Sequence, residues 1–549
     1  MHALSPAATA SAGRHRPVAG CPRWIAQLLV CWGAACGASC GPVEAQEDAS
    51  PPAAATSSAT SPAAAAGAKP DAAPLSRETW DSLYLRGAKV GHARTRITPI
   101  EENGRALLSI VVEQRLALKR FGQSSDQEMT LDSVETPQGE VLRFVTSTKL
   151  GAAPIVARGK LDGKRMVVET RTAGKTQTAE LPWSADIGGV IAVEQSLARR
   201  PLQPGESRAV KSVLPMLDQT MVVTTQLEAK QLEPTPLLSG TYYLLRIESS
   251  VELAGGLKLD SVLWANRSGE VLKTSALAMG LETYRTTRAE ALDEPVNQQF
   301  DLGYDSVVQV DRAIEHAHST REVRYRVTLK SGDPTSVFVS GWTQRVRPLD
   351  EHAAEVTVRG IAPAAIAAAA EAEGWPADEE PTAADRQPNN LVQSDDATVK
   401  ALAAEAAGNE TRPVEVALRL EKFVGERIKS KNFSQALATA AEVAKSLEGD
   451  CTEHAVLLAA MARSRGLPAR VAIGLVYMRS QQAFGYHMWN EIYVDKHWVP
   501  LDATLGQGGI GAAHLKLAHS NLKDTNALTC FLPVAQVLGQ VSIEVLESR

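Results

Sequence analysis

Apolar and polar positions alternate along most of the chain between Trp80 and about Leu292, and this period of two predicts β-strands. Turn signals such as Asp162-Gly163 and Ser268-Gly269 separate the strand-like segments. Many short strands joined by turns predict an antiparallel β-rich domain over residues 76–295, built as a sandwich, a half-barrel or one large curved sheet. The clearest strand-like segments are 107–118, 166–170, 221–227 and 242–253.

A second β-region follows over residues 300–365. The apolar positions of residues 323–329 alternate with Arg324, Arg326 and Thr328, the pattern of a strand with one face in a core and one in water. The region is small for an independent domain. We therefore expect a small β-sandwich-like domain, which either packs against the domain after it or forms an immunoglobulin-like module.

The apolar period becomes helical after Ser394-Asp395, which predicts three helices before Gly449. A further helix is expected from Asp450 to about Gly466, because apolar residues there recur every three or four positions. Three strand-like segments follow, at 469–477, 486–494 and 498–501. The chain from 390 to 549 is thus predicted to be an α+β domain.

Three chemically active side chains lie in this domain, namely Cys451, His487 and Asp502. Cys451 falls in the first turn of the helix, where the dipole favours the thiolate and can lower the thiol pKa to roughly 3.5–7.5. His487 begins one predicted strand and Asp502 follows the next, so antiparallel pairing brings imidazole and carboxylate together. Thiol catalysis requires a nucleophile, a base and a carboxylate that orients the base. The alternative for Cys451 is a small buried core residue.

The runs GDCTEHAVLLAAMARSRGLPARV, HMWNEIYV and HWVPLDAT resemble the transglutaminase-like core of many bacterial proteins. The resemblance implies that Cys451 is the nucleophile, His487 the general base and Asp502 the orienting acid. It also implies an α+β fold related to papain, in which the helix bearing the cysteine packs on an antiparallel sheet. Members of the family hydrolyse amide bonds or transfer an acyl group to an amine, and some have lost catalysis.

A zinc site is the alternative use of these residues. Cys451 and His454 could bind zinc together with His487 or His497, but the C-x-x-H pair lacks a second such pair. No acidic run has the spacing of a calcium loop. We therefore expect neither a metal nor another cofactor.

For four residues near the three chemically active ones, the sequence leaves the role less specific. Trp489 and Trp498 either wall the active-site cleft or pack in the core. Glu491 shares a strand face with His487, where it acts as a supporting partner or is simply solvated. Glu453 is expected to support the helix start.

The first 45 residues resemble an export leader. Arg14, Arg16 and Arg23 precede a short apolar run, and Val43-Glu44-Ala45 is a suitable cleavage site. A lipoprotein leader with Cys40 as the acylated residue is the alternative, and would anchor the chain to the membrane. Residues 46–75 are rich in Ala, Pro and Ser, which predicts a disordered linker.

The net charge and the positions of the cysteines bear on possible partners and on disulfide bonds. The net charge of -6 gives no reason to expect nucleic acid as a partner. Four of the six cysteines lie in the leader, leaving Cys451 and Cys530, so no disulfide framework is expected. A bond between these two would block the nucleophile.

Together these features predict an exported enzyme of the periplasm or cell envelope that acts on a protein or peptide. It would hydrolyse amide bonds through a thioester on Cys451. A cross-linking transamidase with the same three residues and a non-catalytic binding scaffold are the alternatives.

Overall fold

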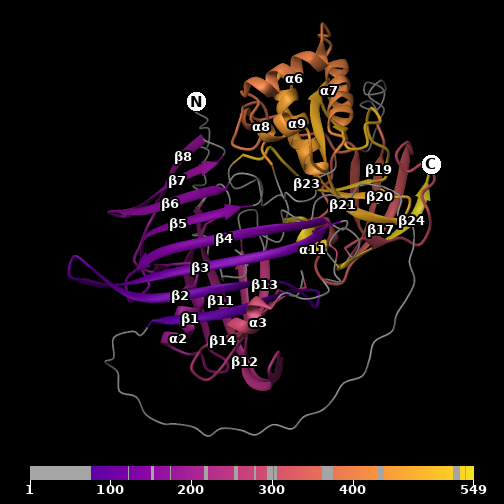
Figure 1. Cartoon of the computed structure of the whole chain (residues 1–549). Coiled ribbons are helices and arrows are strands. Elements are labelled where there is room, and N and C mark those ends of the chain that lie inside the picture. Colours follow the sequence, from indigo (N-terminus) through magenta and orange to yellow (C-terminus); the bar gives the residue numbers. More distant parts are fainter. Residues whose placement is uncertain are drawn as a thin grey trace, which may run out of the picture.

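The computed structural model describes residues 76–549 except for several short ranges, namely 121–122, 150–153, 173–174, 216–219, 253–257, 277–279, 294–300, 302–305, 362–374, 431–437, 524–531 and 538 (Figure 1). The predicted leader, the predicted linker and Cys530 lie outside the described residues. Within the part of the chain that is described, no helix is both long and apolar enough to cross a membrane.

The first half of the described chain forms a single 15-stranded sheet. Most strands pair antiparallel with the next strand in sequence, while the parallel pair β9/β10 is an exception. β1 pairs antiparallel with β15, which places the first and last strands side by side in the middle of the sheet. The strands are β1 (Arg77–Leu85), β2 (Ala88–Glu102), β3 (Arg105–Arg120), β4 (Gln123–Glu135), β5 (Val141–Lys149), β6 (Ile155–Asp162), β7 (Arg165–Thr172), β8 (Lys175–Pro182), β9 (Ile187–Gly188), β10 (Ser207–Pro215), β11 (Thr220–Leu237), β12 (Gly240–Glu252), β13 (Lys258–Ala265), β14 (Val271–Ala276) and β15 (Leu281–Thr286).

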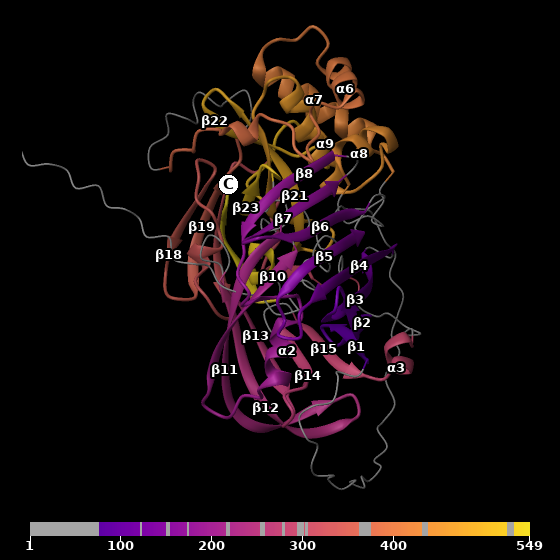
Figure 2. The ribbon, with the colours of Figure 1, turned by 90° about the vertical axis from the view of Figure 1, so that its left-hand side faces the viewer.

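A tight turn and a packed helix illustrate how local sequence shapes this sheet. Asn103 and Gly104 both have positive φ, as a two-residue turn between twisted strands requires. Helix α2 (Ala192–Arg199) buries Val193 and Leu197 against apolar residues of the sheet. Figures 1 and 2 show the sheet as a bent layer below the helices of the second half, with the short helix α3 (Arg288–Leu292) after β15.

Among the described residues, the second half contains five α-helices, a five-stranded sheet and a four-stranded sheet. α6 (Ala397–Ala407), α7 (Pro413–Arg427) and α8 (Ala440–Ser446) surround α9 (Cys451–Ser464), and α9 packs on β20 and β21. Residues 451–463 of α9 are buried all round, which is typical of a central core helix. The strand order is β16 (Val308–Gln309), β21 (Ala483–Val494), β20 (Ala469–Met478) and β23 (His514–Ser520), and β22 (His497–Leu501) pairs with β21.

The strands predicted as a small separate domain over 300–365 do not form a sheet of their own. β18 (Gln344–Pro348), β19 (Ala353–Arg359) and β17 (Glu322–Leu329) are joined by β24 (Val541–Ser548), the last strand of the chain. Tyr325 is buried, and its hydroxyl donates a 2.9 Å hydrogen bond to the carbonyl oxygen of Ala512. The apolar face of this sheet belongs to the same core as α9, so the sheet packs on the α+β region and does not stand alone. The remaining short elements are η2 (Pro334–Ser336), η4 (Ala383–Asp385) and α11 (Leu532–Val537).

The predicted fold class is confirmed. An antiparallel β-rich first half precedes a region of helices packed on a sheet. The helical periods and the three strand-like segments after Gly466 correspond to α6 to α9 and to β20, β21 and β22.

Candidate active site

Cys451 is the first residue of α9 and only 1% of its surface is exposed. The side chain of Asp450 accepts a 2.9 Å hydrogen bond from the N–H of Thr452, and Glu453 accepts one from the N–H of Asp450. This capping box fixes the helix start, and it places the thiol at the positive end of a 14-residue helix. Such a position favours the thiolate.

Glu453 and His454 hold the loop before the helix. Burial, followed by the nearby Asp450 carboxylate, raises the pKa of Glu453 well above its ordinary value. Glu453 also accepts the N–H of Ala438 at 3.1 Å, so it supports the helix start as expected. His454 Nδ1 lies 2.6 Å from the carbonyl oxygen of Asp450, to which it can only donate.

His487 and Asp502 are in direct contact, with Nε2 of His487 2.7 Å from Oδ2 of Asp502. Both side chains are completely buried. The contact follows from the pairing of β21 with β22, because His487 lies on β21 and Asp502 comes directly after β22. Burial alone would raise the pKa of the Asp502 carboxyl, but His487 and His514 outweigh burial and hold this pKa well below its usual range.

The other ring nitrogen of His487 is positioned to act as a base. An ionised carboxylate can only accept, so we assign the ring proton to Nε2, which donates to Asp502. Nδ1 of His487 is buried and has no hydrogen-bond partner among the residues described. Its lone pair is therefore available to take a proton.

A buried hydrogen bond joins the strand of His487 to the helix of Cys451. The side-chain amide of Asn490 donates to the carbonyl oxygen of Ala455 at 2.8 Å. Asn490 lies three residues after His487, and Ala455 lies one helical turn after Cys451. The structure therefore brings His487 and Asp502 into contact and packs the helix that begins at Cys451 on the same strand.

His514 is a site residue that the sequence reasoning missed. It lies at the start of β23, completely buried, and its Nε2 is 3.2 Å from the same Oδ2 of Asp502 that contacts His487. The Trp489 ring lies 5.2 Å from the His514 ring and 6.3 Å from that of His487. Trp489 is buried and packs beside this cluster, and its role as a wall of an active-site cleft stays a prediction.

Glu421 is a second missed residue, and it positions Asp502 from the side of α7. Its Oε1 accepts the N–H of Asp502 at 3.1 Å and the N–H of Gly509 at 3.3 Å. Burial raises the pKa of Glu421 to about 7, although these backbone donors oppose the shift. A Cβ on Gly425 would lie 2.5 Å from the carbonyl oxygen of Ala503, so glycine lets α7 approach this loop. The sequence did carry one sign of this role, because Glu421 is a carboxyl among the apolar positions of an amphipathic helix.

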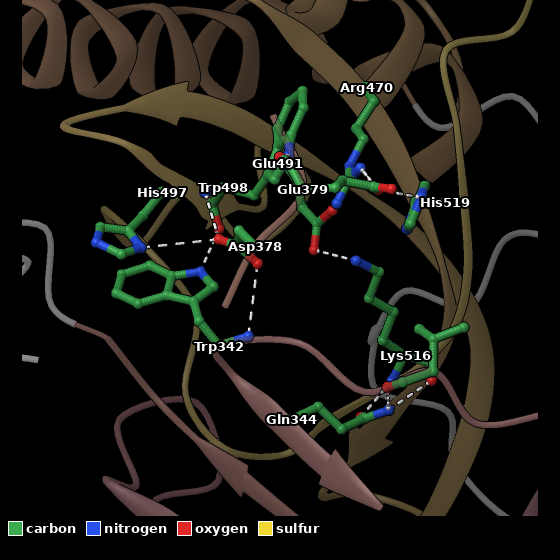
Figure 3. Close-up of polar contacts among 11 residues, drawn as sticks. Trp342, Gln344, Asp378, Glu379, Arg470, Glu491, His497, Trp498, Lys516 and His519 are labelled. Carbon is green, nitrogen blue, oxygen red and sulfur yellow. Dashed lines mark hydrogen bonds and ion pairs between the residues drawn. The ribbon is translucent and has the colours of Figure 1, made fainter. Parts of the chain in front are cut away.

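Trp498 and Glu491 belong to a separate buried network (Figure 3). Glu491 accepts from Arg470 at 2.7 Å and from Lys516 at 2.5 Å, so it is paired and not solvated. The Arg470 guanidinium lies 4.0 Å from the centre of the Trp498 ring and also pairs with Glu379. Trp498 is 1% exposed, and its packing is that of the core.

Comparison with known families places this geometry in context. Residues 400–503 match the profile of the Transglutaminase-like superfamily, and this span contains Cys451, His487 and Asp502. This part of the chain is a transglutaminase-like core. The resemblance read from the three sequence runs is thereby confirmed, and the superfamily match supports a cysteine-type enzyme at the level of the family.

Three solved structures show weak similarity to parts of the chain. A candidate cysteine protease from Cytophaga hutchinsonii is 15% identical with a TM-score of 0.25, over 42% of this chain and 85% of that one. A β-barrel-like protein from Brucella abortus, a domain of unknown function, is 12% identical with a TM-score of 0.28, over 39% and 95%. A candidate protease from Parabacteroides distasonis is 12% identical with a TM-score of 0.17, over 51% and 64%. No curated protein matches the chain.

The zinc alternative required a different set of residues from the one that the structure brings together. Among the described residues, the group with ligand atoms close enough to share an ion is His487, Asp502 and His514. His454 and His497, which the zinc alternative required, are not in this group.

Proposed function

We propose that this protein is an exported cysteine-dependent enzyme that hydrolyses amide bonds through a thioester on Cys451. The observation that carries the proposal is the buried 2.7 Å contact between His487 Nε2 and Asp502 Oδ2. This contact fixes the ring orientation and leaves Nδ1 as a base on the strand that packs against the helix of Cys451.

In the first half of the reaction, Nδ1 of His487 takes the proton of the Cys451 thiol, and Asp502 stabilises the resulting imidazolium. The thiolate attacks the amide carbonyl carbon, and the positive end of α9 stabilises the developing oxyanion. His487 then donates its proton to the nitrogen as the C–N bond breaks. The amine leaves, and the acyl group remains on sulfur as a thioester.

In the second half, water attacks the thioester carbon while His487 takes a proton from the water. The C–S bond breaks, the carboxylic acid leaves, and the proton returns to Cys451. Transamidation differs in this step alone, because an amine replaces the water. We favour hydrolysis since water is the default acceptor for an enzyme outside the cytoplasm, and the substrate class is a protein or a cell-wall peptide.

The location in this proposal rests on the leader-like residues 1–45. The proposed enzyme works in the periplasm or cell envelope, either released or held through a lipid on Cys40. Mass analysis of the N-terminus of the secreted protein distinguishes cleavage after Ala45 from acylation at Cys40.

The test of the catalytic residues is thiol labelling of the purified mature protein with fluorescent iodoacetamide at pH 6. Cys451 should react much faster than Cys530, and His487→Ala should abolish the preference because the thiolate loses its partner. His352→Ala, a change at an exposed histidine, serves as the matched control and should label like the wild type. Equal and slow labelling of both cysteines would favour the non-catalytic scaffold.

The type of reaction requires a separate measurement. The mature protein is incubated with a peptide library, with and without an added primary amine, and the products are read by mass spectrometry. Cleaved or deamidated peptides support hydrolysis, whereas amine-linked products support the transamidase.

A further inference from the structure

His487, Asp502 and His514 form more than a hydrogen-bonded chain. One ligand atom from each of the three residues lies within 4.8 Å of the other two, Nε2 of each histidine contacts Oδ2 of Asp502, and all three residues are buried. We propose that these atoms form a binding site for a first-row divalent cation, with zinc as the reference ion, and that occupation of this site switches off the thiol chemistry. The switching part rests on the proposed function, while the binding part does not.

The ligand set and its spacing suit zinc. Imidazole nitrogen and carboxylate oxygen bind Zn²⁺ at roughly 2.0–2.2 Å, so ligand atoms around a tetrahedral ion lie roughly 3.4 Å apart. The two histidine nitrogens lie 2.7 Å and 3.2 Å from Asp502 Oδ2. A change from hydrogen bonds to ion ligation therefore requires these atoms to separate by less than about 1 Å. Water would take the fourth position.

The surroundings hold the carboxylate in place for such an ion. Oδ1 of Asp502 accepts the N–H of Thr504 at 2.9 Å, which leaves Oδ2 directed at the two histidines. The N–H of Asp502 is held by Glu421. Hydrogen bonds that orient a ligating carboxylate raise the metal affinity of a site. The single negative charge of Asp502 also offsets part of the charge of the ion in this buried position.

Ion binding would disable His487 through its tautomer. A neutral imidazole carries one proton, and in the hydrogen-bonded state we assign this proton to Nε2. A cation on Nε2 requires the lone pair of that nitrogen, so the ring proton moves to Nδ1. Nδ1 then has no lone pair to accept the thiol proton, and Asp502 is drawn to the ion. One ion thus removes both the base and its carboxylate partner.

Metal binding is tested first in the Cys451→Ser protein, which separates it from catalysis. Competition with a chromophoric chelator should show one zinc per chain at micromolar concentration. His514→Gln in this background should weaken binding by more than the roughly 10–100-fold that loss of an outer-shell partner costs. His352→Gln should leave the affinity unchanged, and so controls for zinc held at the surface beside Glu351. Absent binding, or equal binding in His514→Gln, overturns the proposal whether or not the protein is an enzyme.

The switch is tested in the protein with an intact thiol. Zinc should slow iodoacetamide labelling of Cys451 at pH 6, and a chelator should restore the rate. The fold-inhibition, normalised to the zinc-free rate of each variant, should fall at least about 10-fold in His514→Gln. Circular dichroism checks that this variant is folded. Undiminished inhibition in His514→Gln would mean that zinc acts on the thiol directly, and would overturn the switch.

Discussion

The side-chain amide of Asn490 donates a hydrogen bond to the carbonyl oxygen of Ala455, with 2.8 Å between the nitrogen and the oxygen. Asn490 follows His487 on β21, and Ala455 follows Cys451 on α9. This bond joins two elements that are far apart in the sequence. It therefore helps to fix how β21, which carries His487, sits on α9, which begins at Cys451.

Asn490→Ala should lower both stability and thiol reactivity. The change removes this buried hydrogen bond, while the Ala455 carbonyl keeps its helical donor, so the expected cost is about 0.5–1.5 kcal/mol in the free energy of unfolding. Labelling of Cys451 at pH 6 should slow because α9 and β21 lose their fixed alignment. Met488→Leu, a volume-conserving change on the same strand, should cost less than about 1.5 kcal/mol and leave labelling unchanged. Normal labelling in Asn490→Ala would show that this bond does not align the site.

Glu421→Ala should reduce the proposed hydrolysis through its effect on Asp502. The change removes the acceptor of the Asp502 and Gly509 N–H groups, so the carboxylate loop loosens, and the unpaired donors cost about 1–3 kcal/mol. We expect kcat to fall with KM nearly unchanged. Glu421→Gln should keep most activity, because its amide oxygen can accept both hydrogen bonds.

A matched change on the same helix separates this effect from general destabilisation. Glu426→Ala alters an exposed residue of α7 and should change the free energy of unfolding by less than about 0.5 kcal/mol. A Glu421→Gln variant as impaired as Glu421→Ala would mean that the charge of Glu421, and not its role as acceptor, matters.

Local patterns explain how much of the site was predictable. Cys451 could be placed at a helix start because the Asp450 cap and the apolar period are local signals. His487 and Asp502 could be paired because β21 and β22 are consecutive antiparallel strands. The contact of His514 depends instead on the pairing of β23 with β20, and that of Glu421 on the docking of α7. Neither arrangement is encoded in the sequence near those residues.

The same distinction applies to the fold. Hairpins between consecutive strands were predictable from turns such as Asp162-Gly163. The pairing of β1 with β15 and of β17 with β24 joins segments about two hundred residues apart, and no short pattern indicates such partners. This is why residues 300–365 were predicted as a separate domain.

Glu135 should make the β-rich half less stable as the pH rises. Burial raises the pKa of Glu135 from its ordinary value of 4.5 to about 7, although hydrogen bonds from Ser133 and Gln195 oppose the shift. Between pH 4.5 and 7 the unfolded chain loses this proton while the folded chain keeps it, so stability falls as the pH rises. The expected loss is about 3 kcal/mol.

Urea denaturation of the wild type and of Glu135→Gln at several pH values measures this effect. The glutamine does not titrate, so the stability of the variant relative to the wild type should rise by about 3 kcal/mol from pH 4.5 to 7.5. A difference that stays constant across this range would contradict a protonated, buried Glu135.

Glu491→Gln should destabilise the transglutaminase-like core strongly. Burial alone would raise the pKa of Glu491, but Lys516 and Arg470 outweigh burial and lower this pKa to about 2. Only 4% of the Glu491 side chain is exposed, so its removal leaves two buried cations without their shared anion (Figure 3). The expected cost is about 3–5 kcal/mol in the free energy of unfolding.

The exposed end of the same network provides the control for Glu491→Gln. Glu379 pairs with Arg470 but 59% of its side chain is exposed, so Glu379→Gln should cost less than about 1 kcal/mol. Adding Lys516→Met to Glu491→Gln should recover part of the lost stability, because it removes the buried charge of Lys516 that has lost its anion. Equal losses for Glu379→Gln and Glu491→Gln, measured by urea denaturation, would show that the buried charges are hydrated and not held by Glu491.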